Sequence, residues 1–462
     1  MSSEKVDISV IGGGPGGYAA AIRASKLGLK AAVVEEDKVG GVCLNYGCVP
    51  TKSLYHAASL IEEIKRAETF GIKASAPELD FKKAMAVKEQ IIDVQRKGVG
   101  AYFKKNDIKF IEGKGEILEK GKILVKGPDG NETEIETKNI IIATGSSAAN
   151  VEPFDISEDG IMDNKDILSL EKLPEPLLII GGGVVGSEFA NIFSSFGSKV
   201  TIVEILPEIL STEDEDVSKL IHNTFKKKGI DIFTDTKVEN LRKAEGKFKC
   251  TVSGGKEISA EKILISVGRR PNSKGMGLEK AGVEVDEKGY IKVDSHLETN
   301  VSGIYAIGDV IGGLQLAHVA SKEGKIAAGN IAGEEEEMEH DAIPRAIFTS
   351  PEIGTVGLNE RQAKERNIEV CTGIFTFSHN SKACIEGETE GFMKIVTRAG
   401  TGEILGSQVV GPGASDLMHE VVVAMNGELL VDDIASTVHA HPTLSEIVME
   451  AAEDCSGIAT LK

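Results

Sequence analysis

The 462-residue sequence has few cysteines, no long apolar run and a deficit of positive charge. Six cysteines in a chain of this length are too few for a disulfide scaffold, so we expect a reducing, cytoplasmic environment. No segment approaches the roughly 20 consecutive apolar residues that a membrane helix needs. The net charge of −20 and the absence of a basic block disfavour nucleic acid and anionic membranes as partners.

The remaining composition is that of an ordinary globular protein. Hydrophobic residues make up 41% and charged residues 27% of the chain, which leaves ample material for a buried core. At about 150 residues per domain, the length predicts roughly three domains. The first strand is expected within a few residues of the amino terminus, so we expect no secretory signal.

The chain contains one internal repeat. The first copy begins at Ile11 and reads IGGGPGGYAAAIRASKLGLKAAVVEE, and the second begins at Ile180 and reads IGGGVVGSEFANIFSSFGSKVTIVEI. Each copy predicts a strand, a glycine turn, a helix and a second strand that ends on an acid. The pattern is carried by Gly12, Gly14, Gly17 and Glu35, and again by Gly181, Gly183, Gly186 and Glu204. Two copies of the dinucleotide fingerprint predict two Rossmann-like domains.

The residue types in this pattern have a physical reason. The first two glycines let backbone N–H groups approach a pyrophosphate at a helix N-terminus, and the third lets the helix pack closely on the strand. The terminal acid suits the free hydroxyls of an adenosine ribose and repels a 2′-phosphate, so Glu204 favours NAD over NADP. Two bound dinucleotides imply electron transfer from one to the other.

Three further segments end predicted strands with polar or glycine residues. NIIIATGS ends with Thr144, Gly145 and Ser146, ILISVGRRPN contains Gly268, and YAIGDV contains Asp309. Open parallel sheets gather their ligands at such strand ends. For Asp309, a cap of a helix or turn is the alternative interpretation.

Cys43 and Cys48 are the one close pair of cysteines. A one-turn helical loop across the four-residue gap can bring their sulfurs together. Zinc would want two further ligands at similar spacing, and the other cysteines are scattered, so we expect no metal. A redox-active pair beside a cofactor is favoured over a structural disulfide. Lys52, on a predicted helix, could supply positive charge there, with a solvated helix face as the alternative.

A final helix follows His439-Ala-His441-Pro-Thr-Leu-Ser-Glu446. His441 is expected just outside this helix, close enough to Glu446 for the carboxylate to hold one ring nitrogen and leave the other as a base. His318 and His419 are interpreted as packing or backbone-positioning residues.

Together these segments resemble the pyridine nucleotide-disulfide oxidoreductases, most closely the members that oxidise dihydrolipoamide. The resemblance spans nearly the whole chain and rests on GGGPGGY, GGVCLNYGCVPTK, ATGS, GRRPN, AIGD, LAHVA, SPEIGTVG and HAHPTLSE. It implies an α/β fold with two Rossmann-like domains and a C-terminal α+β interface domain that forms a homodimer. The implied boundaries are 1–148 for the first part of the FAD domain, 149–270 for the NAD domain, 271–345 for the segment completing the FAD domain, and 346–462 for the interface domain.

The resemblance also implies a role for each site residue. Cys43 would be the thiol that meets the substrate, and Cys48 the thiolate beside the flavin. Lys52 and Glu188 would pair near the flavin N5, and His441, oriented by Glu446, would be the acid/base. The implied FAD contacts are Gly12, Gly14, Gly17, Glu35, Lys52, Gly115, Thr144, Gly145, Ser146, Asp309, Gln315, Leu316, Ala317 and His318. The implied NAD contacts are Gly181, Gly183, Gly186, Glu188, Glu204, Val238 and Gly268.

The reaction implied is the flavin-dependent oxidation of protein-bound dihydrolipoamide, with reduction of NAD. Its partner would be a lipoyl-bearing protein of a 2-oxo acid dehydrogenase or glycine cleavage complex. Glutathione reductase, mercuric reductase and a non-catalytic flavin- and NAD-binding scaffold are the alternatives. Glu204 argues against glutathione reductase, which normally uses NADPH, and no cysteine pair of the mercuric reductase kind ends the sequence. Retention of both thiols, His441 and Glu446 argues for turnover.

Overall fold

The computed structural model describes residues 2–244 and 246–459. Its first unit is built on a seven-stranded sheet of order β3-β2-β1-β6-β5-β4, with β17 also paired to β6. Strands β1, β2, β3, β6 and β17 run parallel, whereas β4 and β5 form an antiparallel meander with β6. The bounds are β1 (Ser2–Ile11), β2 (Ala31–Glu35), β3 (Lys109–Glu112), β4 (Lys114–Glu119), β5 (Lys122–Lys126), β6 (Glu132–Ile142) and β17 (Ile304–Ala306).

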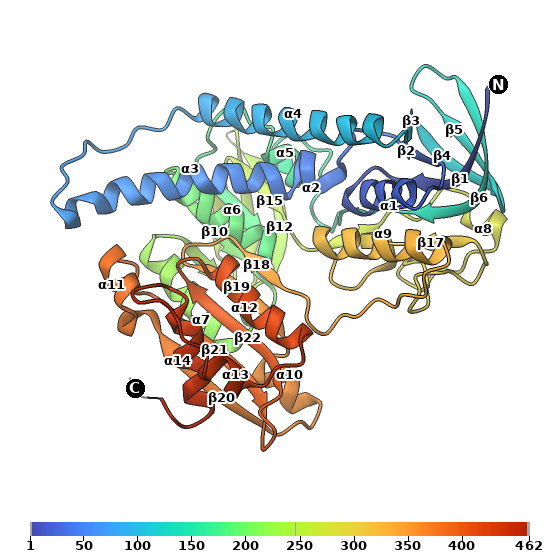
Figure 1. Ribbon diagram of the computed structural model, residues 1–462. Helices are drawn as coiled ribbons and strands as arrows, with labels where there is room; N and C mark the ends of the chain where they lie inside the picture. The colour runs from blue at the N-terminus through green and yellow to red at the C-terminus, as the bar shows by residue number, and fades with distance from the viewer. Residues whose placement is uncertain (1, 245, 460–462) are drawn as a thin grey trace.

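Two helices from distant parts of the sequence lie side by side on this sheet, α1 (Pro15–Lys26) and α9 (Ala317–Ile331) (Figure 1). They approach closely because a Cβ at Gly324 would lie 2.4 Å from the carbonyl oxygen of Gly16. Their alanines pack with Ile8 and Val10 of β1 in one buried cluster. The close packing of α1 and α9 therefore joins a segment about two thirds of the way along the chain to its beginning.

The second unit has a fully parallel five-stranded sheet of order β11-β10-β9-β15-β8. The strands β9, β10 and β15 are buried along their length, as strands covered on both faces must be. A three-stranded antiparallel sheet, β12-β13-β14, belongs to the same unit. The bounds are β8 (Ile161–Met162), α5 (Asn164–Ile167), β9 (Leu177–Ile180), α6 (Val184–Ser195), β10 (Val200–Val203), α7 (Glu215–Lys227), β11 (Asp231–Phe233), β12 (Val238–Ala244), β13 (Lys247–Val252), β14 (Glu257–Ala260) and β15 (Lys262–Ile265).

Helix α3 (Cys48–Arg66) carries the chain from the first unit across the second (Figure 1). Leu54 and Ala58 on its inner face are 1% exposed and pack with Phe189 of α6. Helix α4 (Phe81–Lys105) runs back beside α3, after η1 (Ala67–Phe70). Because α2 (Gly41–Tyr46) begins against the glycine turn of the first unit and α3 packs on α6 of the second, both thiols lie where the two units meet.

The third unit is a five-stranded antiparallel sheet of order β18-β19-β22-β21-β20, flanked by helices (Figure 1). Its core is a separate buried cluster that includes Phe377, Met393 and Val421. The bounds are β18 (Arg345–Ile347), β19 (Glu352–Gly357), α10 (Glu360–Glu365), β20 (Val370–Thr376), η3 (Phe377–His379), α11 (Ser381–Glu386), β21 (Phe392–Arg398), β22 (Ile404–Gly411), α12 (Ala414–Asn426), α13 (Val431–Ala435) and α14 (Glu446–Cys455). Two Rossmann-like units and an α+β unit confirm the predicted fold class.

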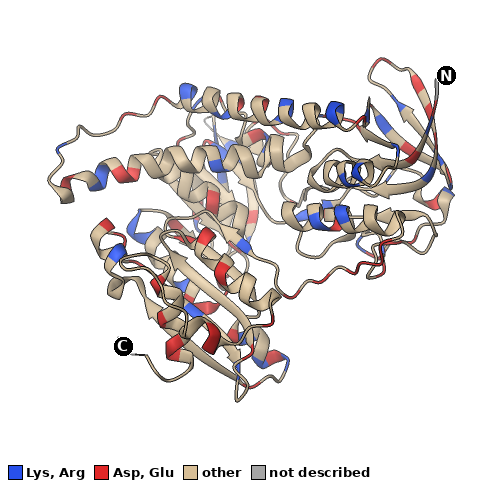
Figure 2. Ribbon diagram, viewed as in Figure 1, with Lys and Arg blue, Asp and Glu red and all other residues tan. Residues whose placement is uncertain are grey.

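The connections between the units are also defined. Strand β7 (Ser146–Ala148) pairs with β16 (Arg269–Pro271), and α8 (Leu278–Ala281) and η2 (Gly308–Ile311) follow before α9. Figure 2 shows acidic residues along the segment between α9 and β18, which contains Glu334 to Glu337. Glu334 pairs with Arg23 of α1 at 2.6 Å. Across the described residues, no helix combines the length and apolarity that crossing a bilayer requires.

Candidate functional site

The first glycine turn has the close backbone contacts that its sequence predicts. Gly12 has a φ of +111°, and a Cβ there would lie 2.2 Å from the carbonyl oxygen of Ala143. A Cβ at Gly17 would lie 1.9 Å from the carbonyl oxygen of Gly12, so α1 packs directly on the turn. Gly14 is the N-cap of α1 and offers no side-chain cap, which leaves the first N–H groups of the helix for a ligand.

Glu35 ends β2 beside this turn. Its carboxylate accepts N–H bonds from Gly13 at 2.7 Å and from Asp37 at 2.9 Å. Burial raises the pKa of Glu35, and the two backbone N–H groups oppose that shift. Each oxygen keeps a further acceptor position, which the hydroxyls of an adenosine ribose could use.

The second glycine turn repeats the same geometry. Gly181 has a φ of +100°, and a Cβ at Gly186 would lie 2.0 Å from the carbonyl oxygen of Gly181. Glu204 accepts N–H bonds from Gly182 at 2.6 Å and from Leu206 at 2.8 Å. Glu35 and Glu204 thus hold equivalent places. Each accepts the N–H of the residue that follows the first glycine of its turn, and the N–H of the residue two positions after itself.

The two thiols form a disulfide, Cys43–Cys48, with the Cα atoms 4.7 Å apart. Cys43 lies on the short helix α2, whose start is pressed against the first glycine turn. A Cβ at Gly41 would lie 2.7 Å from the Cα of Gly14. Cys48 is the first residue of α3. The fold therefore places a disulfide directly beside the predicted pyrophosphate site.

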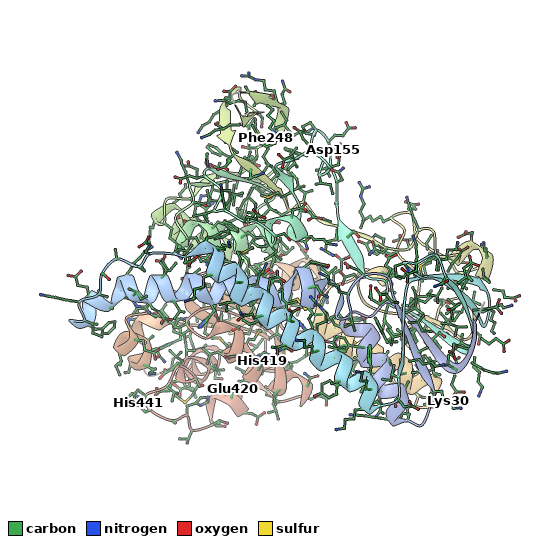
Figure 3. All side chains as sticks on the ribbon, turned by 90° about the horizontal axis from the view of Figure 1, so that it is seen from above. Lys30, Asp155, Phe248, His419, Glu420 and His441 are labelled. Atoms are coloured by element: carbon green, nitrogen blue, oxygen red, sulfur yellow. A yellow bond between two sulfur atoms is a disulfide. The ribbon has the colours of Figure 1, made fainter. Side chains whose placement is uncertain are left out.

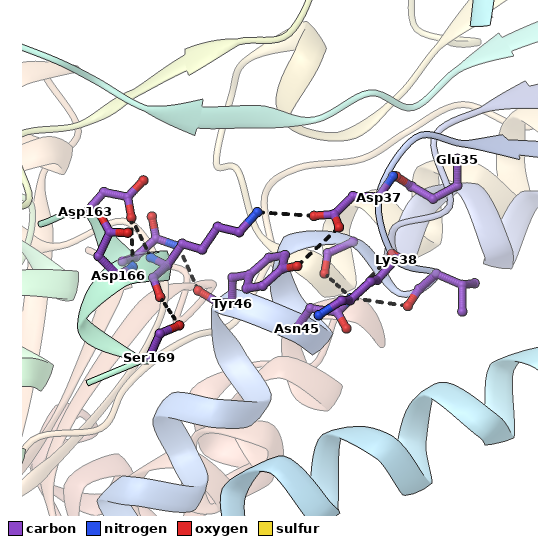
Figure 4. Close-up of polar contacts among 12 residues, drawn as sticks. Glu35, Asp37, Lys38, Asn45, Tyr46, Asp163, Asp166 and Ser169 are labelled. Carbon is purple, nitrogen blue, oxygen red and sulfur yellow. Dashed lines mark hydrogen bonds and ion pairs between the residues drawn. The ribbon is translucent and has the colours of Figure 1, made fainter. Parts of the chain in front are cut away.

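A polar network holds the segment between Glu35 and Cys43 (Figure 4). The Asn45 amide donates to the carbonyl oxygens of Gly41 at 2.9 Å and Val39 at 3.2 Å. The Tyr46 hydroxyl donates to Asp37 at 3.3 Å, and Lys165 lies 4.3 Å from the centre of the Tyr46 ring. Sequence reasoning passed over Asn45 and Tyr46, although both lie inside the thiol motif.

Lys52 and Glu188 meet across 136 residues of sequence, as predicted. The Lys52 ammonium donates to both carboxylate oxygens of Glu188, at 2.9 and 2.8 Å. Glu188 is 5% exposed and Lys52 32% exposed, so the pair lies at the edge of the interior. Lys52 lies one turn of α3 after Cys48, which brings the ion pair next to the disulfide.

The segment ATGS lies directly beside the first glycine turn, because a Cβ at Gly12 would meet the carbonyl oxygen of Ala143. The Ser146 hydroxyl donates to Asp309, and Arg269 donates to the Ser146 hydroxyl at 2.6 Å and lies 3.5 Å from Asp309. Thr144 donates to the carbonyl oxygen of Asn272 at 2.8 Å. The structure thus brings Thr144, Gly145, Ser146 and Asp309 together, and adds Arg269, which sequence reasoning left unassigned although it follows Gly268.

Residues 315–318 lie at the beginning of α9. Gln315 has a φ of +51°, and its amide nitrogen is buried without a hydrogen-bond partner among the described residues. The His318 ring contacts the carbonyl oxygen of Pro344 at 2.8 Å, which agrees with a backbone-positioning residue. The unpaired Gln315 amide and the glycine turn are features that a bound dinucleotide would satisfy, so this chain's residues fit FAD.

The three most isolated predictions have different surroundings. A Cβ at Gly115 would lie 3.1 Å from Ile11 and 3.3 Å from Val34, so Gly115 lies against the ends of β1 and β2. Gly268, with a φ of +122°, immediately precedes β16. Val238 is 5% exposed and its side chain belongs to the apolar core of the second unit. Only the backbone of Val238 is available as a ligand contact.

His441 and Glu446 pair as predicted, with Nδ1 and Oε1 2.8 Å apart. The other Glu446 oxygen accepts the N–H of Thr443 at 2.9 Å. Burial raises the pKa of Glu446, but the Thr443 N–H and the His441 ring together outweigh it, so the pKa lies below its ordinary value of 4.5. The His441 side chain is 68% exposed.

The histidine pair and the disulfide are far apart in one chain. Helix α14 lies in the third unit, whereas α2 lies beside the start of α3 in the first unit (Figure 1). Figure 3 shows His441 on the third unit. Within residues 2–244 and 246–459, no hydrogen bond or ion pair links His441 to Cys43. A second histidine pair lies in the same unit, where the ring of His439 contacts Glu420 at 2.8 Å. The side chain of His439 is only 7% exposed.

Two further observations concern ligands. A cavity of about 350 Å³ lies beside Leu44, the neighbour of Cys43, and is lined mainly by apolar surface between α1 and α4, including Tyr18, Val99 and Tyr102. Across the described part of the chain, no cluster of three or more His, Cys, Asp or Glu side chains is arranged to hold a metal ion.

Comparisons with known proteins agree with this geometry. Residues 6–324 match the family described as Pyridine nucleotide-disulphide oxidoreductase, and residues 343–452 match the dimerisation domain of that family. Dihydrolipoyl dehydrogenase from Bacillus subtilis (strain 168) is 40% identical over 98% of this chain and 99% of its own length. The dihydrolipoyl dehydrogenase of Geobacillus stearothermophilus is 40% identical over 97% of this chain and 96% of its own length.

Solved structures share the whole fold. LpdA from Mycobacterium tuberculosis has a TM-score of 0.90 at 28% identity, covering 98% of this chain and 99% of that chain. RclA from Escherichia coli, a flavoprotein disulfide reductase, has a TM-score of 0.88 at 28% identity, covering 97% and 99%. The two glycine turns, the disulfide and these matches along nearly its full length establish that the chain belongs to the pyridine nucleotide-disulfide oxidoreductases, whose cofactors are FAD and NAD.

Proposed function

We propose that this protein oxidises protein-bound dihydrolipoamide to lipoamide and reduces NAD, through FAD and the Cys43–Cys48 disulfide. The observation that carries the proposal is the disulfide at the start of α2 and α3, between the first glycine turn and the Lys52–Glu188 ion pair. Relatives at 40% identity over nearly the whole chain are dihydrolipoyl dehydrogenases, which supports this substrate.

The thiol steps follow from the disulfide and one base. His441 takes a proton from one substrate thiol, whose sulfur attacks Cys43 while Cys48 leaves as the thiolate. The second substrate thiol attacks the mixed disulfide and its proton passes to the Cys43 sulfur, so that lipoamide leaves and the pair ends as a Cys43 thiol and a Cys48 thiolate beside protonated His441. Bound FAD would supply the two-electron relay between the reduced thiol pair and NAD. Lys52 would hold positive charge next to the new thiolate, and Glu188 would hold Lys52 in place.

We propose that His441 comes from the second subunit of a homodimer. Its pair with Glu446 fixes the tautomer in which Nε2 is the free base. The exposure of His441 and its separation from Cys43 within the chain support a shared site, as does the match of residues 343–452 to a dimerisation domain.

The remaining assignments are also part of the proposal. We place the boundaries at 1–148, 149–270, 271–345 and 346–462, supported by β17 completing the first sheet. The partner would be a lipoyl-bearing protein of a 2-oxo acid dehydrogenase or glycine cleavage complex, in the cytoplasm.

One experiment separates this function from its alternatives. NADH oxidation by one purified sample would be measured with lipoamide, oxidised glutathione and Hg(II) as acceptors. Lipoamide is expected to be reduced at least about a hundredfold faster than the other two, which is roughly 3 kcal/mol of discrimination. A faster rate with either rival acceptor would contradict the proposal, and reduction of an artificial dye by NADH alone would distinguish a flavoenzyme from a scaffold.

A further inference from the structure

We propose that Phe348, at the beginning of the dimerisation domain, is a positioning residue for the Lys52–Glu188 pair. This inference rests on the proposed place of that pair beside the flavin. It adds a direct route by which the third unit of the same chain shapes the flavin site.

The backbone of Phe348 holds the acid. Its N–H donates to Oε1 of Glu188 at 3.0 Å, the same oxygen that accepts from Lys52. A carboxylate that is 5% exposed needs such partners, because few of its lone pairs can reach water. The rotamer of Glu188 is therefore fixed from two sides, by α3 and by the segment after β18.

The side chain of Phe348 holds the Lys52 ammonium. The Lys52 ammonium lies 4.7 Å from the centre of the Phe348 ring, within the range of a cation–π contact. Glu188 accepts two of the three N–H donors of this ammonium, so one donor remains for a ligand. A lysine that is 32% exposed would otherwise sample several rotamers, and the ring removes that freedom.

Phe348 is itself anchored. The Tyr55 ring meets it edge-on at 5.6 Å, and the Tyr55 hydroxyl donates to the carbonyl oxygen of Thr349 at 3.1 Å. Ile347, the preceding residue, is 2% exposed and packs in the core that contains Leu54 and Phe189. The ring is thus held against α3 by both of its neighbours in sequence, and it transmits that fixed position to Lys52.

The test uses Phe348→Leu, which keeps the backbone N–H and an apolar side chain but removes the aromatic face. A less ordered Lys52 stabilises negative charge less well, so two changes are expected. The midpoint potential of bound FAD becomes more negative, and the long-wavelength absorption of the half-reduced protein loses at least half its amplitude. Phe348→Tyr retains the aromatic face and is expected to restore both readouts.

The matched control is Phe392→Leu, because Phe392 lies in the same unit with Lys394 6.0 Å from its ring centre. It is expected to leave potential and absorption unchanged. In a Lys52→Met background, Phe348→Leu should produce no further change, since the ring acts through Lys52. If Phe348→Leu does not retain FAD, Phe348→Met and Phe348→Tyr make the same comparison.

A Phe348→Leu protein that binds FAD with the wild-type potential and absorption would overturn the inference, as would an equal effect in the Lys52→Met background. Both readouts are independent of lipoamide. Failure of the wild type to turn over lipoamide would contradict the proposed function and leave this inference standing.

Discussion

Glu204 is the residue that we expect to choose the nicotinamide cofactor. Its carboxylate is 8% exposed and already accepts two backbone N–H groups, so it is fixed in place. A 2′-phosphate there would meet a like charge. The wild type is therefore expected to prefer NADH over NADPH by a few kcal/mol in kcat/KM.

Glu204→Ala should lower that preference at least about tenfold, which corresponds to roughly 1.4 kcal/mol. Glu35→Ala is the control, because Glu35 has the same contacts in the first repeat. It is expected to reduce FAD content and to leave the NADH to NADPH ratio of the loaded protein unchanged. Comparable efficiency with NADPH in the wild type would contradict the assignment.

Cys43 is expected to carry the chemistry and not the cofactor. Cys43→Ser should lower lipoamide turnover by at least about four orders of magnitude, since no sulfur remains to form the mixed disulfide. The purified variant should still be yellow with FAD. Cys384→Ser, a control at an exposed cysteine in α11, should retain wild-type turnover. A colourless Cys43→Ser protein would place Cys43 in cofactor binding.

Glu446 and Glu450 lie one turn apart on α14, and the ionisation of each is expected to have the opposite effect on the stability of the fold. The pKa of folded Glu446 is below 4.5, so its ionised form adds stability above that pH and loses it as the pH falls through the folded pKa. Burial, with smaller contributions from Glu453 and Glu446, raises the pKa of Glu450, so ionised Glu450 costs stability above its folded pKa.

Melting temperatures of Glu446→Gln and Glu450→Gln between pH 7 and pH 3.5 test these signs. Glu446→Gln should melt below the wild type at pH 7, with the difference narrowing below pH 4.5. Glu450→Gln should melt at or above the wild type at pH 7, with its advantage also disappearing in acid. Melting temperatures that change in the same direction from the wild type in both variants at pH 7 would contradict these signs.

At the scale of elements, Lys394 joins β21 to the beginning of α7. It is 2% exposed and lies 2.5 Å from Asp216, 3.5 Å from Asp214 and 3.6 Å from Glu360. Burial lowers the pKa of Lys394, but the three acids together raise it above its ordinary value, so the charge is kept. The ion pairs therefore fix the third unit to α7 of the second unit.

Lys394→Met should destabilise the protein by about 3 kcal/mol, because it leaves the buried carboxylate of Asp214 without its cation. Lys227→Met removes an exposed ion pair with Glu390 and should cost less than about 0.5 kcal/mol. Thermal melting of both variants at matched ionic strength gives the comparison. Equal shifts would mean that the Lys394 cluster adds nothing beyond a surface pair.

The sequence predicted those elements whose signal is local. Each repeat encodes a strand, a glycine turn, a helix and an acid in one stretch, and the structure has both as predicted. The resemblance brought Lys52 and Glu188 together, although nothing local connects them. Phe348 carried no signal, because an apolar residue after a short strand usually means core packing. Its contacts with Lys52 and Glu188 depend on the docking of a third unit, which no periodicity encodes.

At the scale of the whole molecule, the parts of the proposed active site lie at opposite ends of one chain. The disulfide lies where the first two units meet, and the exposed His441–Glu446 pair lies on the third. A two-fold dimer lets each end meet the other end of its partner. The central claim is that two chains build each site.

The direct test is a mixed dimer with one Cys43→Ser chain and one His441→Gln chain, co-expressed with different tags and isolated by both. Each parent dimer should be inactive in NAD-linked dihydrolipoamide oxidation. The mixed dimer contains one doubly damaged site and one fully native site, so activity should recover towards half the wild-type rate. A verified mixed dimer with no activity above its parents would show that His441 acts within its own chain, and would contradict the shared site.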